Sequence, residues 1–320
     1  MKNIIPLLFP AFLCIVCFFY FDYLPFGRAS NTDSQFLESL GKNMEQPAAA
    51  KLLKAAAEQL EKHISVDANI RLKLTFCGSD YSGSGFYIEK RNDTQLNNDF
   101  VDRLFRMEIR FHPSIADSSL NESNTMKVVC DGDSVWKYSI IEGENKFQRF
   151  EIGKISEAIS KSERAGELNI LSKLPSLGSL GGTIREIQNV YDFNTGVVEN
   201  VELGSSEFPA LKIRTTMKKE YVDRMLATAG TRKEDIRRAE KQIPVGIAVY
   251  LGQDDYFPYR IEYFSGPIGS IAWEEPSTQQ DFYKVRLNEM NISTDRFQNT
   301  PPEGMSSKDE TDAYIDSLNL

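Results

Sequence analysis

The stretch that decides the fold reads FYKVRLNEMNISTDRFQNTPPEGM and covers residues 282–305. Aromatic and aliphatic side chains alternate with charged ones through its first residues, which is the period of a β-strand. A short turn, the aromatic Phe297 and the run Pro301-Pro302-Glu303-Gly304 follow. Because proline cannot donate to a sheet and glycine tolerates positive φ, this order predicts a last edge strand that closes a sheet. We expect Phe297 to plug the end of its core.

The two-residue period recurs through most of the chain. Turn sequences such as Asp131-Gly132 and Glu142-Gly143 stand between successive runs. Strands that follow strands with little helix between them predict a mainly β fold with an antiparallel sheet. The expected strands are NIRLKLTF (69–76), GFYIEKR (85–91), LFRMEIRFH (104–112), TMKVVCDG (125–132), SVWKYSII (134–141), KFQRFEI (146–152), TIREIQNVYDF (183–193), VVENVEL (197–203), ALKIRTTM (210–217), VGIAVYL (245–251), YRIEYFS (259–265), SIAWEEP (270–276) and FYKVRLNEM (282–290).

One clear helix precedes the first strand. In PAAAKLLKAAAEQLEKHI, residues 47–64, apolar side chains such as Leu53 and Leu60 recur at helical spacing, and Pro47 suits a first turn. A single apolar stripe must be buried on one side. The pattern therefore predicts a sheet that curls around this helix.

Two helical segments are expected to interrupt the strands, one at 153–174 and one, densely charged, near 217–243. The first runs into PSLGSLGG (175–182), which is interpreted as a flexible loop. Its GSLGG part lacks the Gly-Lys-Ser/Thr ending of a phosphate-binding loop and is therefore read as a linker. Residues 306–320 form a polar tail in which a short frayed helix is expected.

The chain has 320 residues, 41% of them apolar and 26% charged, which is typical of a globular protein with one large or two small domains. Its formal net charge is −9. A nucleic-acid binder would carry a basic footprint, and no cluster of Lys and Arg of that kind stands in the sequence. We therefore expect no nucleic-acid partner.

The N-terminus indicates export. Lys2 precedes a long apolar run, and Gly27-Arg28-Ala29 fits a cleavage site. Residues 1–29 are therefore either a cleaved signal peptide or a retained membrane anchor, since the run is long enough to span a bilayer. Residues 30–46 form a polar spacer. The body is expected in the periplasm or cell envelope, soluble after cleavage or tethered by the anchor. Cys14 and Cys17 lack the small residues that a lipobox needs before its cysteine.

The exported part keeps two cysteines, Cys77 and Cys130, each at the end of an expected strand. An oxidising compartment permits a disulfide between them, and two separate buried thiols are the alternative.

Three separated motifs resemble the LolA-like lipoprotein-carrier superfamily, and they stand in that family's order. They are GSGFYIEKR (83–91), CDGDSVWKYSI (130–140), and the spacing Phe297, Pro301, Pro302, Gly304. The resemblance implies an incomplete antiparallel β-barrel wrapped around helices, with an apolar cavity for lipid or acyl chains. It covers residues 47–305 as one domain with two helical insertions. Asn92 stands where the family has a proline, and an insertion follows at 93–101, so the chain resembles a divergent member.

The resemblance implies non-catalytic binding of a lipid, an acyl chain or a lipoprotein anchor, and transport across the envelope. Arg91 matches the family's arginine that helps to control the cavity. Arg91 and the aromatic Trp136 and Tyr138 are the candidate ligand-binding residues, and a packed core is the alternative for the aromatic side chains. The alternative is an envelope sensor or scaffold that contacts a membrane-bound partner protein through its inserted helices.

Residues for catalysis are not evident. His63 stands near the end of the first helix, where a cation suits the helix dipole, and His112 precedes Pro113 without a recognisable partner. The sequence contains no Gly-x-Ser-x-Gly elbow, no HExxH motif and no Cys/His set with metal spacing. We therefore expect no enzyme activity, no cofactor and no metal.

Overall fold

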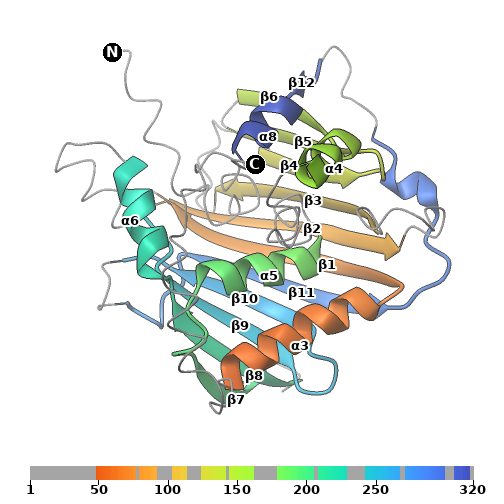
Figure 1. The fold of residues 1–320 in the computed structure, drawn as a ribbon. Coiled ribbons are helices and arrows are strands. Elements are labelled where there is room, and N and C mark those ends of the chain that lie inside the picture. Colours follow the sequence, from red (N-terminus) through yellow and green to blue (C-terminus); the bar gives the residue numbers. More distant parts are fainter. Residues whose placement is uncertain are drawn as a thin grey trace.

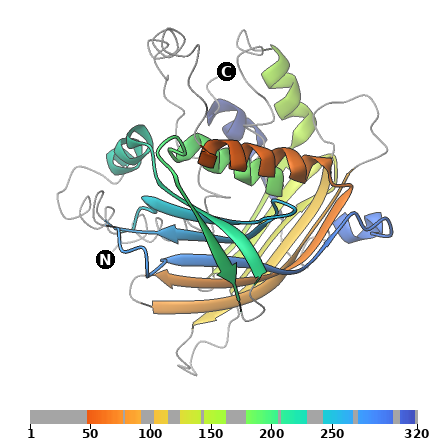
Figure 2. The same ribbon diagram turned by 90° about the horizontal axis from the view of Figure 1, so that it is seen from below.

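The computed structural model describes residues 48–76, 79–91, 103–113, 124–141, 144–161, 179–204, 208–228, 242–266, 271–299 and 306–317. Within these residues the fold is mainly β, as predicted. One sheet of 12 strands curls without closing, and helices lie along its inner side (Figures 1 and 2). The expected incomplete barrel around helices is confirmed by this architecture.

The sheet consists of two antiparallel meanders that meet in its middle. Its order is β12-β6-β5-β4-β3-β2-β1-β11-β10-β9-β8-β7. The strands are β1 (Ser65–Phe76), β2 (Ser79–Arg91), β3 (Arg103–Pro113), β4 (Asn124–Cys130), β5 (Ser134–Ile141), β6 (Glu144–Glu151), β7 (Val197–Leu203), β8 (Phe208–Thr216), β9 (Gly246–Gly252), β10 (Pro258–Phe264), β11 (Thr278–Leu287) and β12 (Lys308–Asp309).

The stretch that opened the sequence analysis forms β11, and β11 is not an edge strand. It lies between β1 and β10, with Ile70 opposite Phe282 and Arg260 opposite Asp281. The prediction of a last edge strand is therefore wrong. The proline punctuation marks the end of the strand correctly, but which strands flank it depends on pairing over more than two hundred residues. The described edges are β7 and β12.

The register separates the two faces of the sheet. Directly paired residues share a face and successive residues alternate. On the inner face, Val66 is opposite Glu89, Glu89 is opposite Phe105, and Phe105 is opposite Cys130. Residues of this face belong to one continuous apolar core with the helices. The outer face carries the neighbours in sequence, such as Ile88 and Arg106.

Five α-helices are described: α3 (Ala48–Lys62), α4 (Ile152–Lys161), α5 (Leu180–Val190), α6 (Lys219–Thr228) and α8 (Thr311–Ser317). Helix α3 confirms the predicted first helix and buries Leu53, Ala56 and Leu60 in the core. Helix α5 lies beside it over the inner face (Figure 1). Among the described residues, no helix is long and apolar enough to cross a membrane.

Two strand predictions and one loop prediction fail. Residues 183–193, expected as a strand, lie mostly in α5, because Ile184, Ile187 and Val190 fit a helical stripe as well as a two-residue period. Residues 180–182 of the GSLGG linker are the start of the same helix, and the Ser179 hydroxyl accepts from the backbone N–H of Gly182 as its N-cap. The described residues 271–276 of the expected strand SIAWEEP form a turn.

Two glycines let β2 and β3 approach closely where the sheet curls. A Cβ built on Gly85 would lie 1.8 Å from the carbonyl oxygen of Glu108, and one on Gly83 would lie 2.7 Å from Cβ of Phe111. Glycine at a tight bend of a sheet is the usual solution to such an approach. The GSG run of the second strand therefore has a structural reason.

The residues after β11 cross to the outer face. A short 3-10 helix, η5 (Thr294–Phe297), buries Phe297 in a small cluster with Ile88, Leu104 and Ile292. Phe297 thus fills a core, as expected, but this core is separate from the main one. Further on, β12 pairs in parallel with β6, and Tyr314 of α8 packs edge-on against Phe150. The segment treated as a polar tail therefore contributes a strand and a helix.

Candidate functional site

The C-terminal end of α3 is held by two arginines from the sheet. Arg91 on β2 donates through Nη2 to the carbonyl oxygen of Glu61 at 2.9 Å. Arg103 on β3 donates to the carbonyl oxygens of Leu60, at 3.1 Å, and of His63, at 3.0 Å, and also to that of Glu61. The last carbonyls of a helix have no partner within the helix and carry the negative end of its dipole. The two arginines therefore supply hydrogen-bond donors to these carbonyls and positive charge to the negative end of the helix dipole.

The N-terminal end of α5 lies beside a negatively charged side chain. The backbone N–H of Leu180 donates to the Tyr87 hydroxyl at 2.8 Å and lies 3.4 Å from Oε2 of Glu89. The Tyr87 hydroxyl in turn donates to Glu89. A carboxylate suits the positive end of a helix dipole. Burial, and then the Glu89 carboxylate, raise the pKa of Tyr87 far above its ordinary value, so its hydroxyl stays a donor.

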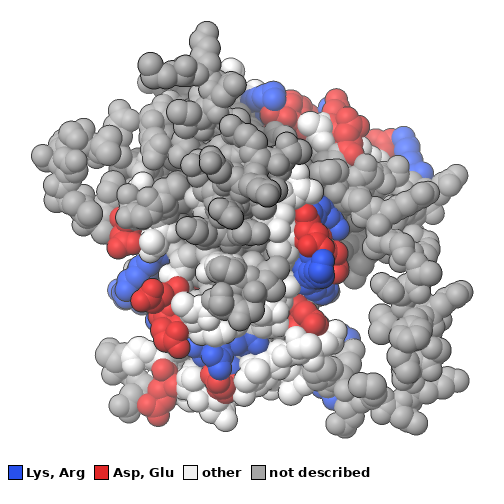
Figure 3. All heavy atoms as spheres, turned by 90° about the vertical axis from the view of Figure 1, so that its left-hand side faces the viewer, with Lys and Arg blue, Asp and Glu red and all other residues white. Residues whose placement is uncertain are grey.

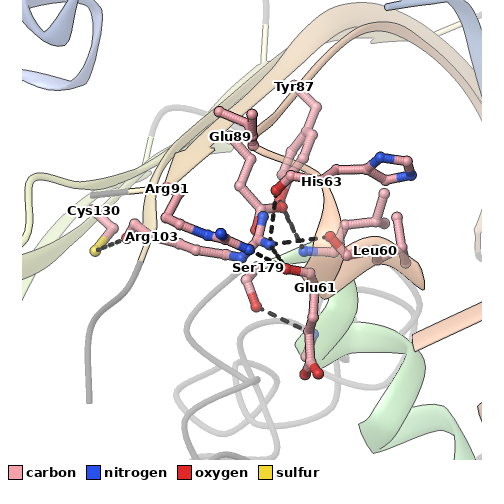
Figure 4. Close-up of polar contacts among 12 residues, drawn as sticks. Leu60, Glu61, His63, Tyr87, Glu89, Arg91, Arg103, Cys130 and Ser179 are labelled. Atoms are coloured by element: carbon pink, nitrogen blue, oxygen red, sulfur yellow. Dashed lines mark hydrogen bonds and ion pairs between the residues drawn. The ribbon is translucent and has the colours of Figure 1, made fainter. Parts of the chain in front are cut away.

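The two helix ends are joined by an ion pair. Arg103 Nη1 lies 2.9 Å from Oε1 of Glu89, and the Glu89 side chain is only 3% exposed. Figure 4 shows these groups converging beneath β2 and β3. We name Tyr87, Glu89, Arg91 and Arg103 the polar clasp. It fastens α3 and α5 to β2 and β3 at one end: Glu89 pairs with Arg103, and Arg91 is held by a backbone carbonyl of α3.

A large apolar surface lies beside the clasp on the inner face. It is shared by the sheet and the helices and belongs to one buried cluster. The buried apolar side chains that β1 to β5 contribute to it are Val66, Ala68, Ile70, Leu72, Leu74, Met107, Ile109, Met126, Val128 and Val135. Such a surface suits apolar contact, and the buried Lys137, opposite Val128, shares this face.

The three residues expected to contact a ligand do not form one group. Arg91 belongs to the polar clasp. Trp136 and Tyr138 lie on the outer face of β5, because their neighbour Val135 is in the core on the inner face. Trp136 stacks on Phe147 with ring centroids 5.7 Å apart, and its Nε1 donates to Asp131. The assignment of Trp136 and Tyr138 as ligand contacts stays a prediction. The first helix lies against the inner face of the sheet, opposite to the face that carries these two side chains.

The disulfide prediction falls partly outside the described residues, because Cys77 lies there. Cys130 is a buried free thiol that donates to the Arg103 carbonyl at 3.6 Å, and burial raises its pKa to about 12. Phe76, the residue before Cys77, pairs with Ser79 at one end of β2, whereas Cys130 is level with Glu89 near the other end. The pairing stays a prediction, and this register argues against it.

Sequence reasoning missed Glu89 and Arg103. In GSGFYIEKR the apolar Phe86 and Ile88 look like the inward set, which would send Tyr87 and Glu89 to solvent. The structure reverses this, since Ile88 packs in the outer cluster with Phe297. A signal was nevertheless present: one face of the strand carries Tyr87, Glu89 and Arg91, a combination that forms a hydrogen-bonded network when buried.

Neither histidine lies in a catalytic arrangement. His63 is 7% exposed, and His112 is exposed at the end of β3. Within the described ranges no group of His, Cys, Asp and Glu could hold a metal ion. On the side of the molecule shown in Figure 3, the described basic and acidic residues lie interspersed rather than gathered by sign.

No family model matches the chain, and no curated protein matches its sequence. Among solved structures, MucB is similar at 10% identity and a TM-score of 0.35, over 79% of this chain and 62% of MucB. A DUF1329 family protein from Desulfovibrio piger matches at 12% identity and a TM-score of 0.33, over 80% and 98% of the two chains. A putative outer membrane lipoprotein-sorting protein domain from Vibrio parahaemolyticus matches at 8% and 0.29, over 78% and 95%.

MucB in complex with MucA(peri) is similar to the same degree, at 11% identity and a TM-score of 0.33, over 79% of this chain and 59% of that one. The chain thus spans about three fifths of MucB. Every one of these TM-scores lies below 0.5.

Proposed function

We propose that this is an exported, non-catalytic protein that binds a lipid, an acyl chain or a lipoprotein anchor between the inner face of its sheet and helices α3 and α5. One observation carries the proposal: a pair of helices lies across the apolar face of an unclosed sheet, held at one end by the polar clasp and, at the other end of α5, by the hydrogen bond from the Tyr191 hydroxyl to the Pro244 carbonyl.

Burial of an acyl chain on this face would be favourable, since each CH₂ removed from water contributes about 0.8 kcal/mol. Aliphatic side chains from several strands offer contact along a chain of ordinary length. Within the clasp, Glu89 pairs with Arg103 and Arg91 donates to a backbone carbonyl, so the apolar face beside it is the part that would hold the acyl chain.

The proposal is tested with a photoreactive fatty-acid probe added to the delipidated protein. Saturable uptake with cross-links on the inner-face residues Met107 or Val128, located by fragmentation of the labelled peptides, is the expected result. Cross-links confined to the outer-face residues Trp136 and Tyr138 would move the site to the other side of the sheet. Absence of saturable uptake would refute lipid binding altogether.

A matched pair of variants makes the test specific. Met107→Trp adds volume to the inner face and should reduce uptake, while Arg110→Trp adds the same ring on the outer face of the same strand and should not. Arg110 has a 67% exposed side chain, whereas Met107 is 3% exposed. Equal thermal stability of the two variants rules out an effect of unfolding.

The second candidate function is a scaffold that contacts a membrane-bound partner through an inserted helix. Helix α6 supports it: Val222 and Met225 face the core, while Lys219 and Asp223 form an exposed pair on the other side. Exchanging the charges (Lys219→Asp with Asp223→Lys) keeps the pair and alters the surface. Loss of partner capture with unchanged probe uptake would favour the scaffold.

A further inference from the structure

His63 occupies a buried position between the end of α3 and the start of β1. Its side chain is 7% exposed, and Nδ1 lies 3.2 Å from Nδ2 of Asn288. Asn288 follows β11, so the contact joins the two strands that unite the halves of the sheet. Burial lowers the pKa of His63, which favours the neutral ring.

The orientation of the Asn288 amide fixes the tautomer of His63. The backbone N–H of Ile64 donates to Oδ1 of Asn288 at 2.9 Å, so Oδ1 is the acceptor and the NH₂ group faces the ring. The NH₂ group must therefore donate to Nδ1, which carries no proton. Asn288 also donates its backbone N–H to the carbonyl of Ser65 at 2.9 Å, and its φ of 62° is one that asparagine tolerates.

Protonation of Nδ1 would set an N–H against the NH₂ group of Asn288, two donors with no acceptor between them. Nε2 offers no relief, because it is buried without a hydrogen-bond partner. The ring would then be a buried cation beside a second one, since Arg103 donates to the carbonyl of His63 itself.

Two carboxylates near the ring act in the opposite direction, and both are already engaged. Glu89 pairs with Arg103 and accepts from Tyr87. Asp255, in the turn between β9 and β10, accepts from the Tyr259 hydroxyl at 2.8 Å and from the backbone N–H of Phe257 at 2.9 Å. Neither carboxylate makes a hydrogen bond to the ring.

We propose that His63 and Asn288 form a proton-sensitive joint that fastens the end of α3 and the start of β1 to the end of β11. At neutral pH the joint is closed. Acidification breaks the contact of Nδ1 with Asn288 and loosens this end of the helix cover from the sheet. The inference concerns the fold alone and stands whether or not the protein binds a lipid.

Hydrogen exchange of the full chain at pH 7.5 and pH 5.0, corrected for intrinsic rates, tests the joint. The amides of Ile64 and Asn288 should lose protection at pH 5.0 relative to pH 7.5, because protonation of His63 breaks the contact that holds them. The amide of Ile70, in the middle of β1, should keep its protection. Unchanged protection of Ile64 and Asn288 would overturn the proposal.

The chain has two histidines, which gives a matched control. His63→Asn places a side-chain amide oxygen, which cannot titrate, near the position that Nδ1 occupies in the natural protein, so protection should persist at pH 5.0. His112→Asn changes the exposed histidine and should retain the acid-induced loss. The proposal fails if His63→Asn loses protection as the natural protein does.

A spectroscopic measurement remains decisive even if His63→Asn folds poorly. Asn288→Asp puts a carboxylate against Nδ1, so the imidazolium gains an acceptor. The titration midpoint of the His63 ring followed by NMR should rise above that of the natural protein by one unit or more, roughly what an adjacent carboxylate produces. A midpoint that does not rise would show that the ring does not face residue 288.

Discussion

The side chain of Arg103 joins two structural layers: one guanidinium nitrogen contacts Glu89 on the neighbouring strand, and the other donates to carbonyls at the end of α3. The sheet and its helical cover are thus connected through this cation, and Arg91 adds a second link to α3. The strength of this connection can be measured by removing its partner.

Glu89→Ala should destabilise the protein by about 3–5 kcal/mol, because it leaves Arg103 buried without its counter-ion and removes an acceptor from Tyr87 and Leu180. Urea unfolding followed by circular dichroism measures the change. Glu202→Ala, at an exposed site on β7, should stay within about 0.5 kcal/mol.

The double variant Glu89→Leu with Arg103→Met separates charge imbalance from loss of contact. Replacing both members of a buried pair by apolar groups is often nearly neutral. We expect it to regain most of the stability lost in Glu89→Ala. If the loss of stability in the double variant equals the sum of the losses in the two single variants, Glu89 and Arg103 are not energetically coupled, contrary to what their geometry indicates.

Gly85→Ala should destabilise by about 3 kcal/mol or more, since its Cβ would meet the backbone oxygen of Glu108, which cannot move aside as a side chain can. The control is Gly153→Ala in α4, where nothing lies within 4 Å of the new methyl group and helix propensity predicts a gain of about 0.5–1 kcal/mol. Chemical denaturation should show a loss of stability for Gly85→Ala and a gain for Gly153→Ala.

Cys130 should resist iodoacetamide in the native protein at pH 8, because the thiolate is the reactive form and its pKa is raised to about 12 by burial. Peptide mapping after alkylation reports this site separately from the other cysteines. In denaturant without reductant Cys130 should react fully. A site that stays unlabelled there would instead demonstrate a disulfide.

Phe297→Ala should cost about 3–5 kcal/mol, the usual effect of deleting a buried ring, because Phe297 is 1% exposed among Ile88, Leu104 and Ile292. Met290→Ala nearby, 76% exposed, should change stability by less than about 0.5 kcal/mol. Equal effects at the two sites would show that the outer cluster adds no stability.

Stability should fall as the pH drops below about 6.5. The pKa of His63 is lowered in the folded state, so the unfolded chain takes up the proton first. The contribution of His63 to the free energy of unfolding therefore has its full value above the pKa of His63 in the unfolded chain. Below that pH it decreases, by up to about 1.4 kcal/mol per pH unit, until the pKa of His63 in the folded protein is reached. His63→Asn should show a flatter profile between pH 7.5 and 5.5 in urea titrations.

Local patterns predicted most elements, because alternation and capping act over a few residues. The first helix and eleven of the thirteen expected strands appear within the described residues. The segment at 183–193 failed because isoleucine and valine at spacings of three satisfy a helix, and Ser179 supplies its cap.

The site was harder to predict, because the inward face of a strand depends on its neighbours. In β2 the choice between Ile88 and Glu89 as the inner residue is set by pairing with Val66 and Phe105 and by the cluster around Phe297. A single sequence carries no record of these contacts. Arg91 was reached through a family resemblance, and its partners on α3 emerged only from the structure.

The central place of β11 bears on how the chain reaches its fold. Strands β1–β6 and β7–β10 can each form from nearby segments, but β1 meets its second neighbour only when residues 278–287 arrive. Closing so long a loop is slow, and until then each half presents an unpaired strand edge that favours aggregation. A fragment that stops before Thr278 should therefore aggregate, and the newly made chain is most exposed to misassembly until residues 278–287 are available to pair.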